Sequence, residues 1–189
     1  MVVGFSDNWL FDVGQENNSI PKFLVHAFFA FLWFSILVIQ AGLISKKNTK
    51  LHMKLGMAGM AAYAGFFLST AFLYITNLLE DGVLQPLAIM NVMLFGYGSF
   101  LIITGFLNRQ KDTSKHKKHI LIGTLMLMEP GISRTLNHIV GQGTEPLWLL
   151  TYLVLFGLFI WFFKRINWQL GVGFVIWLAG LANFIASMG

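Results

Sequence analysis

Long apolar stretches, separated by short polar ones, make up most of the chain. A membrane-spanning helix needs about 20 consecutive, mainly apolar residues. Six stretches have this character, at residues 21–44, 51–77, 86–107, 119–140, 146–163 and 168–188. The connections between them leave no room for a soluble domain. The pattern predicts an all-α polytopic membrane protein, with an outer N-terminal segment over residues 1–20 and a bundle of six transmembrane helices over residues 21–189.

Composition supports the same class of protein. Of the 189 residues, 56% are hydrophobic and 11% are charged, whereas soluble domains carry about 25% charged residues. So much apolar surface indicates contact with a lipid bilayer. The chain contains no cysteine, which excludes disulfides, thiolate-bound metals and cysteine nucleophiles.

Charged residues alternate between the two sets of connections. One set carries eleven of the thirteen basic residues: Lys46, Lys47, Lys50, Lys54, Arg109, Lys111, Lys115, Lys117, Lys118, Lys164 and Arg165. The other set carries Asp7, Asp12, Glu16, Glu80, Asp81 and Glu145. The positive-inside rule makes the basic side cytoplasmic, so both termini are expected outside. The net charge of +5 therefore reflects topology, and nucleic acid is not an expected partner.

Small residues recur in the second apolar stretch, where "GMAGMAAYAG" begins at Gly56, and in "FGYGSF", which contains Gly96 and Gly98. Small residues let helices approach closely. The alternative interpretation is a flat face against which a planar cofactor rests.

Depth along the predicted helices divides the five histidines into two sets. An α-helix rises about 1.5 Å per residue, so His119 and His138 on one helix are expected roughly 28 Å apart. That distance is nearly the full hydrocarbon thickness, about 30 Å. His52, His116 and His119 then form a cytoplasmic set, and His26 and His138 form an outer set.

Histidines on different helices at matched depth are the ligands that bis-histidine haem b requires. The expected ligand pairs are His26 with His138 and His52 with His119. The alternative for each is an ordinary interfacial or packed histidine, and that alternative is favoured for His116. His26 lies in the apolar run "FLVHAFFAFLW", where an ionisable residue indicates function.

Ionisable residues also occur in the middle of the fourth apolar stretch. Glu129 is expected near the bilayer midplane, where a carboxyl group must be protonated, paired or bound to a metal. Pro130 removes a backbone donor and loosens the helix. Either Arg134 pairs with a haem propionate beside His138 while Glu129 serves a proton path or a quinone carbonyl, or Glu129 and Arg134 form a structural pair.

Other polar residues fall near the outer halves of the predicted helices: Asn77, Asn91, Asn137 and Asn183, with Tyr63 and Tyr74. Together with Arg134 and His138 they are candidates to line an outward-facing cavity. The last two apolar stretches contain no ionisable group within their apolar spans, so they are interpreted as scaffold or contact surface.

Two resemblances follow from the histidine segments. "KLHMKLG", at residues 50–56, resembles the opening of a ligand-bearing helix in transmembrane b-type cytochromes that move electrons between ascorbate or quinone and an acceptor. This resemblance implies that His52 is a haem ligand.

"LHMKLGMAGM" followed by "HKKHILIGTLMLMEPGISR" resembles a widespread group of small bacterial multi-pass proteins of unassigned function. The matching positions are His116, Lys117, Lys118, Pro130 and Arg134, and His52 also falls inside the matched segments. The resemblance implies a location in the bacterial inner membrane and no particular activity.

The leading functional hypothesis is therefore a membrane electron carrier or quinone-linked redox protein. It would hold haem b through His26, His138, His52 and His119, with Arg134 on a propionate. A second hypothesis is a non-enzymatic subunit, packed in a larger membrane complex or a homo-oligomer. A third is a proton-coupled transporter of small solutes that uses Glu129.

Overall fold

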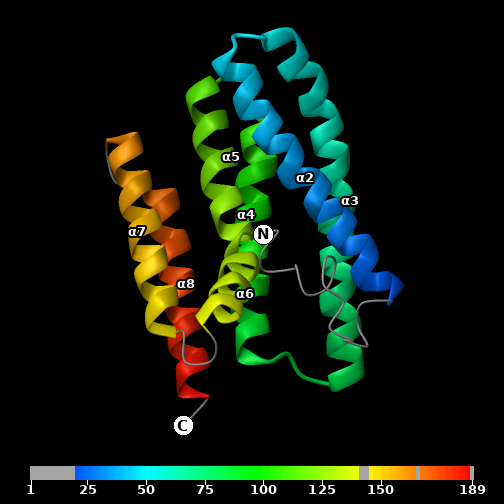
Figure 1. Ribbon diagram of the computed structural model, residues 1–189, viewed down its shortest axis with the longest axis vertical. Coiled ribbons are helices and arrows are strands. Elements are labelled where there is room, and N and C mark those ends of the chain that lie inside the picture. Colours follow the sequence, from blue (N-terminus) through cyan, green and yellow to red (C-terminus); the bar gives the residue numbers. More distant parts are fainter. Residues whose placement is uncertain (1–19, 141–144, 165–166, 188–189) are drawn as a thin grey trace. The chain divides into compact units, whose positions relative to one another are not determined.

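The computed structural model describes residues 20–140, 145–164 and 167–187, and within these ranges the regular structure is entirely α-helical. The helices, labelled in Figure 1, are α2 (Pro21–Ser45), α3 (Thr49–Asp81), α4 (Pro86–Leu107), α5 (Thr113–Leu127), α6 (Glu129–Val140), α7 (Glu145–Phe163) and α8 (Trp168–Ala186). Five of them, α2, α3, α4, α7 and α8, are long and apolar enough to cross a membrane. The all-α class is therefore confirmed for the described residues, and the five long apolar helices are consistent with a multi-pass membrane protein. The N-terminal segment expected over residues 1–20 lies almost wholly outside the described residues.

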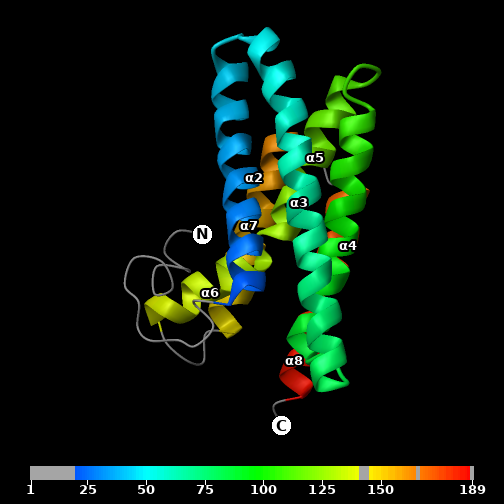
Figure 2. The same ribbon diagram turned by 90° about the vertical axis from the view of Figure 1, so that its right-hand side faces the viewer.

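The single helix predicted over residues 119–140 is wrong, because this segment forms two helices. Helix α5 ends at Leu127 and α6 begins at Glu129, and Figure 2 shows α6 turned away from the axis of α5. Pro130 has no N–H to donate to the carbonyl of Met126, which interrupts the hydrogen-bond ladder at this point. The estimate of roughly 28 Å between His119 and His138 assumed one straight helix and no longer applies.

The described residues fall into two compact units, residues 20–84 and residues 85–187. The first is the hairpin of α2 and α3. Lys47, with a φ of 57°, turns the chain between them, and the Asn48 side chain caps α3 by accepting from the N–H of Leu51 at 3.1 Å. At the opposite end of the hairpin, the Lys22 ammonium lies 3.1 Å from the Glu80 carboxylate.

Close packing of α2 against α3 depends on the small residues noted in the second apolar stretch. A side chain in place of Gly65 would collide with the ring of Phe29. At Gly59 an added methyl group would meet Ile36 at 3.0 Å. Close helix packing therefore accounts for these two glycines.

The second unit contains two kinds of helix contact. Helices α4 and α5 approach at backbone distance where Gly98 faces Gly123. Helix α7 instead meets α8 through large aromatic side chains. The rings of Tyr152 and Trp177 are stacked with centroids 4.4 Å apart, and those of Phe156 and Phe174 lie 4.6 Å apart. Small residues therefore join one pair of helices, and aromatic rings join the other.

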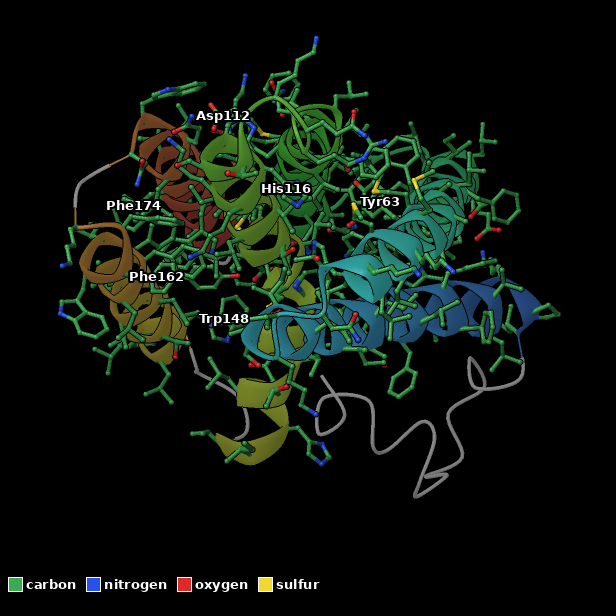
Figure 3. The ribbon with its side chains drawn as sticks, turned by 90° about the horizontal axis from the view of Figure 1, so that it is seen from above. Tyr63, Asp112, His116, Trp148, Phe162 and Phe174 are labelled. Atoms are coloured by element: carbon green, nitrogen blue, oxygen red, sulfur yellow. The ribbon has the colours of Figure 1, made fainter. Side chains whose placement is uncertain are left out.

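The end of α4, the start of α5, the end of α7 and the start of α8 lie at the same end of this unit. Figure 3 views the molecule from that end, with Asp112 and His116 at the start of α5. The Lys117 ammonium lies 4.7 Å from the centre of the Phe162 ring on α7. Tyr97 on α4 donates to the backbone oxygen of Gln169 on α8 at 2.8 Å. The basic residues from Arg109 to Lys118 thus share one end with Lys164.

We expect Gly123→Ala to destabilise the protein by about 1–3 kcal/mol, the usual effect of overpacking. The added methyl carbon would lie 2.7 Å from the Gly98 carbonyl oxygen and 2.8 Å from Ile102. Gly96 is the matched control, because nothing lies within 4 Å of a methyl group built there. Gly96→Ala should stabilise the helix by about 0.5–1 kcal/mol. Unfolding in mixed micelles measures both, and effects of the same sign would contradict the packing described here.

Candidate functional site

Glu129 is the most deeply buried ionisable residue among the described residues of the second unit. It is the first residue of α6, directly after the break at Met128. Its side chain is 0% exposed. Ser133 and Asn91 lie close enough to influence its charge. Within the described chain, however, neither carboxyl oxygen has a hydrogen bond of acceptable geometry.

Two further polar groups from other helices lie beside this carboxyl. Asn91 comes from α4, and Tyr152, which is 1% exposed, comes from α7 near enough for the Glu129 charge to act on its phenol. The Asn91 amide oxygen and the Tyr152 hydroxyl are also buried without a hydrogen-bond partner among the described residues. We call Asn91, Glu129, Ser133 and Tyr152 the Glu129 cluster.

Such a cluster is energetically expensive in a packed protein. Each buried polar group without a partner costs about 1–3 kcal/mol, and most buried polar groups in native structures are satisfied. An ionisable residue in a membrane interior usually belongs to an ion, proton or substrate pathway. The cluster is thus suited to binding a proton, water or a small polar solute.

The outer residues of α6 do not join the Glu129 cluster. Arg134 and His138 are both exposed, and Arg134 makes no hydrogen bond to the Glu129 carboxyl. Asn137 and Asn183 are exposed as well. Asn91, which was grouped with Arg134 and His138 in an outer cavity, lies beside Glu129 instead.

His119 lies in a second polar group, nearer the basic end of the unit, and is 4% exposed. Its Nδ1 lies 2.8 Å from the Thr104 hydroxyl of α4, and its Nε2 lies 3.3 Å from the Gln169 amide nitrogen of α8. Thr104 donates its own hydrogen to Phe100 at 2.8 Å. The network therefore assigns the hydrogen to Nδ1, which donates to Thr104, while Nε2 accepts from Gln169.

His119 thus ties α4, α5 and α8 together. Because both ring nitrogens are engaged, His119 fits a haem iron only if the contact to Gln169 breaks. The neighbouring His116 is also held by the protein, since its Nδ1 lies 3.0 Å from the Gly105 carbonyl oxygen.

His26 and His52 lie in the α2–α3 hairpin. The Nδ1 atom of His26 lies 3.3 Å from the Thr70 hydroxyl and 3.4 Å from that of Ser69. His52 stands in the first turn of α3, where its backbone oxygen accepts from Gln40 at 3.0 Å. Each predicted ligand pair, His26 with His138 and His52 with His119, takes one residue from each unit. In the part of the chain that the structure describes, no group of three or more His, Asp or Glu side chains could hold a metal ion. A haem held by two histidines does not require such a group.

The interpretation of the last two helices as scaffold missed residues that belong to these polar groups. Tyr152 stands within the apolar run "LWLLTYLVLF", and Gln169 is in the first turn of α8. Neither is charged at neutral pH, so a search for ionisable groups passed over both. A search for hydrogen-bonding side chains within apolar stretches would have found them.

Comparisons of the chain with protein-family models, with curated proteins and with solved structures find no match.

Proposed function

We propose that this protein is a proton-coupled membrane transporter of small solutes, in which Glu129 takes up and releases the proton. The observation that carries the proposal is a fully buried carboxyl whose nearby polar groups, Ser133 and Asn91, make no hydrogen bond of acceptable geometry to either oxygen. It stands beside an unpartnered amide oxygen and an unpartnered phenol. A carboxyl in this setting is neutral when it holds a proton and strongly destabilised when it does not. When the Glu129 carboxyl releases its proton, the resulting carboxylate is therefore expected to bind water or a polar solute in the place of the proton.

The position of Glu129 at a helix break supports the same mechanism. Secondary transporters bind substrates and coupling ions near the bilayer midplane, where discontinuous helices expose their backbone ends. Glu129 begins α6, where the partial positive charge of the helix N-terminus stabilises an anion. Asn91 and Tyr152 supply hydrogen-bonding groups for the solute or for water. Movement of α6 relative to α5 would open the site to one side and then the other.

The proposal includes a membrane arrangement. Helices α5 and α6, of 15 and 12 residues, together form one discontinuous crossing, so the chain crosses the bilayer six times. The basic ends then face the cytoplasm, both termini face outward, and the protein resides in a bacterial inner membrane. In this arrangement, every basic connection lies on the cytoplasmic side of the membrane.

Uptake by reconstituted protein tests the proposal. Vesicles that contain the protein and a trapped pH-sensitive dye are diluted into panels of sugars, amino acids and organic ions. We expect at least one class of solute to acidify the lumen only when the protein is present. Infrared difference spectra should show a protonated carboxylic acid that disappears in alkali. No solute-dependent acidification and no such band would refute the transporter.

A second candidate function is the haem b electron carrier, with a quinone as its partner, and the geometry of His26 favours it. Two hydroxyl groups orient the His26 ring through Nδ1, as the hydrogen-bond partners of metal-bound histidines do through the nitrogen that does not bind the metal. His138 would be the second histidine that holds the haem, and Arg134 would pair with a propionate. Haem would supply one-electron transfer when bound. His119 fits this role least well, because both of its nitrogens are engaged.

The visible spectrum of purified protein separates the two functions. A haem protein should show a Soret band that shifts on reduction, and His26→Ala should remove one equivalent of pigment. His116→Ala is the control, because the His116 ring is held by a backbone carbonyl and its loss should leave the pigment unchanged. A colourless protein without iron would end the haem hypothesis. If it also shows no uptake, the structural subunit of a larger complex or homo-oligomer is the role that remains.

A further inference from the structure

An apolar groove runs between α5 and α7 in the unit of residues 85–187, with a volume of about 400 Å³. Leu121, Thr124 and Met128 line it from the α5 side, and Thr151, Leu155 and Phe159 line it from α7. Its volume is within the range of ligand pockets, about 300–1,000 Å³. It does not overlap the Glu129 cluster, since none of the cluster's side chains lines it.

The groove lies parallel to the two helices. Leu121 to Met128 on α5 and Thr151 to Phe159 on α7 each cover about 10–12 Å of helix rise. Because α5 and α7 run in opposite directions, Leu121 stands at the level of Phe159, towards the basic end of the unit. An apolar groove of this direction and length matches part of an extended acyl chain lying along the helices.

Positive charge stands at the end of the groove nearest that basic end. Lys117 is one turn before Leu121, and its ammonium lies 4.7 Å from the ring centre of Phe162, which is close to one turn beyond Phe159. This cation–π contact places Lys117 across the groove end and against α7. Lys118 and Lys164 are its basic neighbours at the same end. Asp112, the acidic residue directly before α5, accepts from the Lys115 N–H at 2.8 Å and caps the helix.

We propose that this groove binds one anionic phospholipid, with an acyl chain between α5 and α7 and its phosphate at Lys117. The groove supplies apolar surface for the chain, and the lysines supply charge complementary to the headgroup. Basic residues at a membrane surface attract anionic lipid. Release of the Lys117 ammonium from the Phe162 ring lets it pair with phosphate. The proposal of a lipid site does not depend on the transport or the haem hypothesis.

Native mass spectrometry of delipidated full-length protein tests the site with two lipids of identical acyl chains. Dioleoyl-phosphatidylglycerol is the anionic probe, and dioleoyl-phosphatidylcholine is the zwitterionic control. We expect one phosphatidylglycerol to remain bound at collision energies that remove phosphatidylcholine. Lys117→Gln should weaken phosphatidylglycerol binding about fivefold, the effect of one basic residue near an anionic surface, and should leave phosphatidylcholine unaffected.

Filling the groove provides the second test. Leu155→Trp places an indole in the path of the acyl chain and should abolish the retained lipid. Leu153→Trp is the matched control, because Leu153 is on the same helix, is 48% exposed and lies outside the groove. Equal retention of the two lipids by the unmodified protein would overturn the proposal, as would undiminished retention by Leu155→Trp. Binding of decylubiquinone that phosphatidylglycerol cannot displace would assign the groove to a quinone and also overturn it.

Discussion

Glu129→Gln is expected to abolish proton-coupled uptake while making the protein more stable. Uptake should fall to the level of protein-free vesicles. A glutamine amide has the same size as the carboxyl but cannot take up and release a proton at physiological pH. The infrared signal of the protonated carboxyl should vanish with it. This result would locate the coupling step at one side chain in the interior of the protein.

The gain in stability has a separate physical reason. Removal of a carboxylate from water costs several kcal/mol unless it is paired, and Glu129 has no hydrogen bond in the described chain. A glutamine is neutral and can donate to the unpartnered oxygen atoms of Asn91 or Tyr152. We expect the free energy of unfolding in mixed micelles to rise by about 1–2 kcal/mol, the net value of a buried hydrogen bond.

Asp81→Asn is the matched control for Glu129→Gln. Asp81 is exposed at the end of α3, so the same loss of a carboxylate should change neither uptake nor stability. Normal uptake by Glu129→Gln would refute the role of this carboxyl in coupling. A marked loss of stability would instead show that Glu129 holds the break between α5 and α6 together. If the site is functional, Glu129→Gln should raise stability and abolish transport. Other proteins whose active sites contain energetically unfavourable groups show the same opposite response.

His119→Ala is expected to destabilise the protein by about 2–4 kcal/mol. The substitution leaves a cavity at a residue that is 4% exposed. It also removes the partner of Gln169, and a buried polar group without its partner costs about 1–3 kcal/mol. Thr104 keeps its bond to Phe100, so the loss falls mainly on the contact between α5 and α8. Chemical or thermal unfolding in micelles measures the change.

His138→Ala serves as the control for His119→Ala, because His138 is exposed on α6. Its effect should stay within about 0.5 kcal/mol, as for most surface substitutions. A small effect at His119 would mean that its hydrogen bonds to Thr104 and Gln169 contribute little to stability. If the purified protein proves to be pigmented, loss of colour in His119→Ala would show that the ring binds iron in place of Gln169.

The two polar groups of the second unit differ in the completeness of their hydrogen bonding. The His119 ring uses both of its nitrogens, and only the Gln169 amide oxygen in its group is unpartnered, whereas both Glu129 carboxyl oxygens, the Asn91 amide oxygen and the Tyr152 hydroxyl lack a partner among the described residues. Complete networks make a structure rigid and specific, and incomplete ones mark places where a ligand or water completes the bonding. This contrast is the reason for assigning structure to His119 and function to Glu129.

The helical class and the positions of most helices followed from the sequence by itself. Apolar stretch length and the residues at each end are local properties, so α2, α4, α7 and α8 agree with their predicted ranges to within two residues. Pro130 indicated a weakened helix, although the extent of the break was underestimated. The local sequence also indicated the importance of Glu129. A carboxyl group within an apolar stretch is unusual, whatever the direction of its side chain.

Only the tertiary structure decided which side chains surround those residues. Asn91 and Tyr152 approach Glu129 from α4 and α7, and Thr104 and Gln169 approach His119 from α4 and α8. Depth along a helix can be counted from sequence, but the direction in which a side chain points around the axis depends on how neighbouring helices pack. The α4–α5 contact at Gly98 and Gly123 and the aromatic spacing of α7 from α8 set those directions. Burial of a polar group against a particular partner is a property of several helices together, and no single segment contains it.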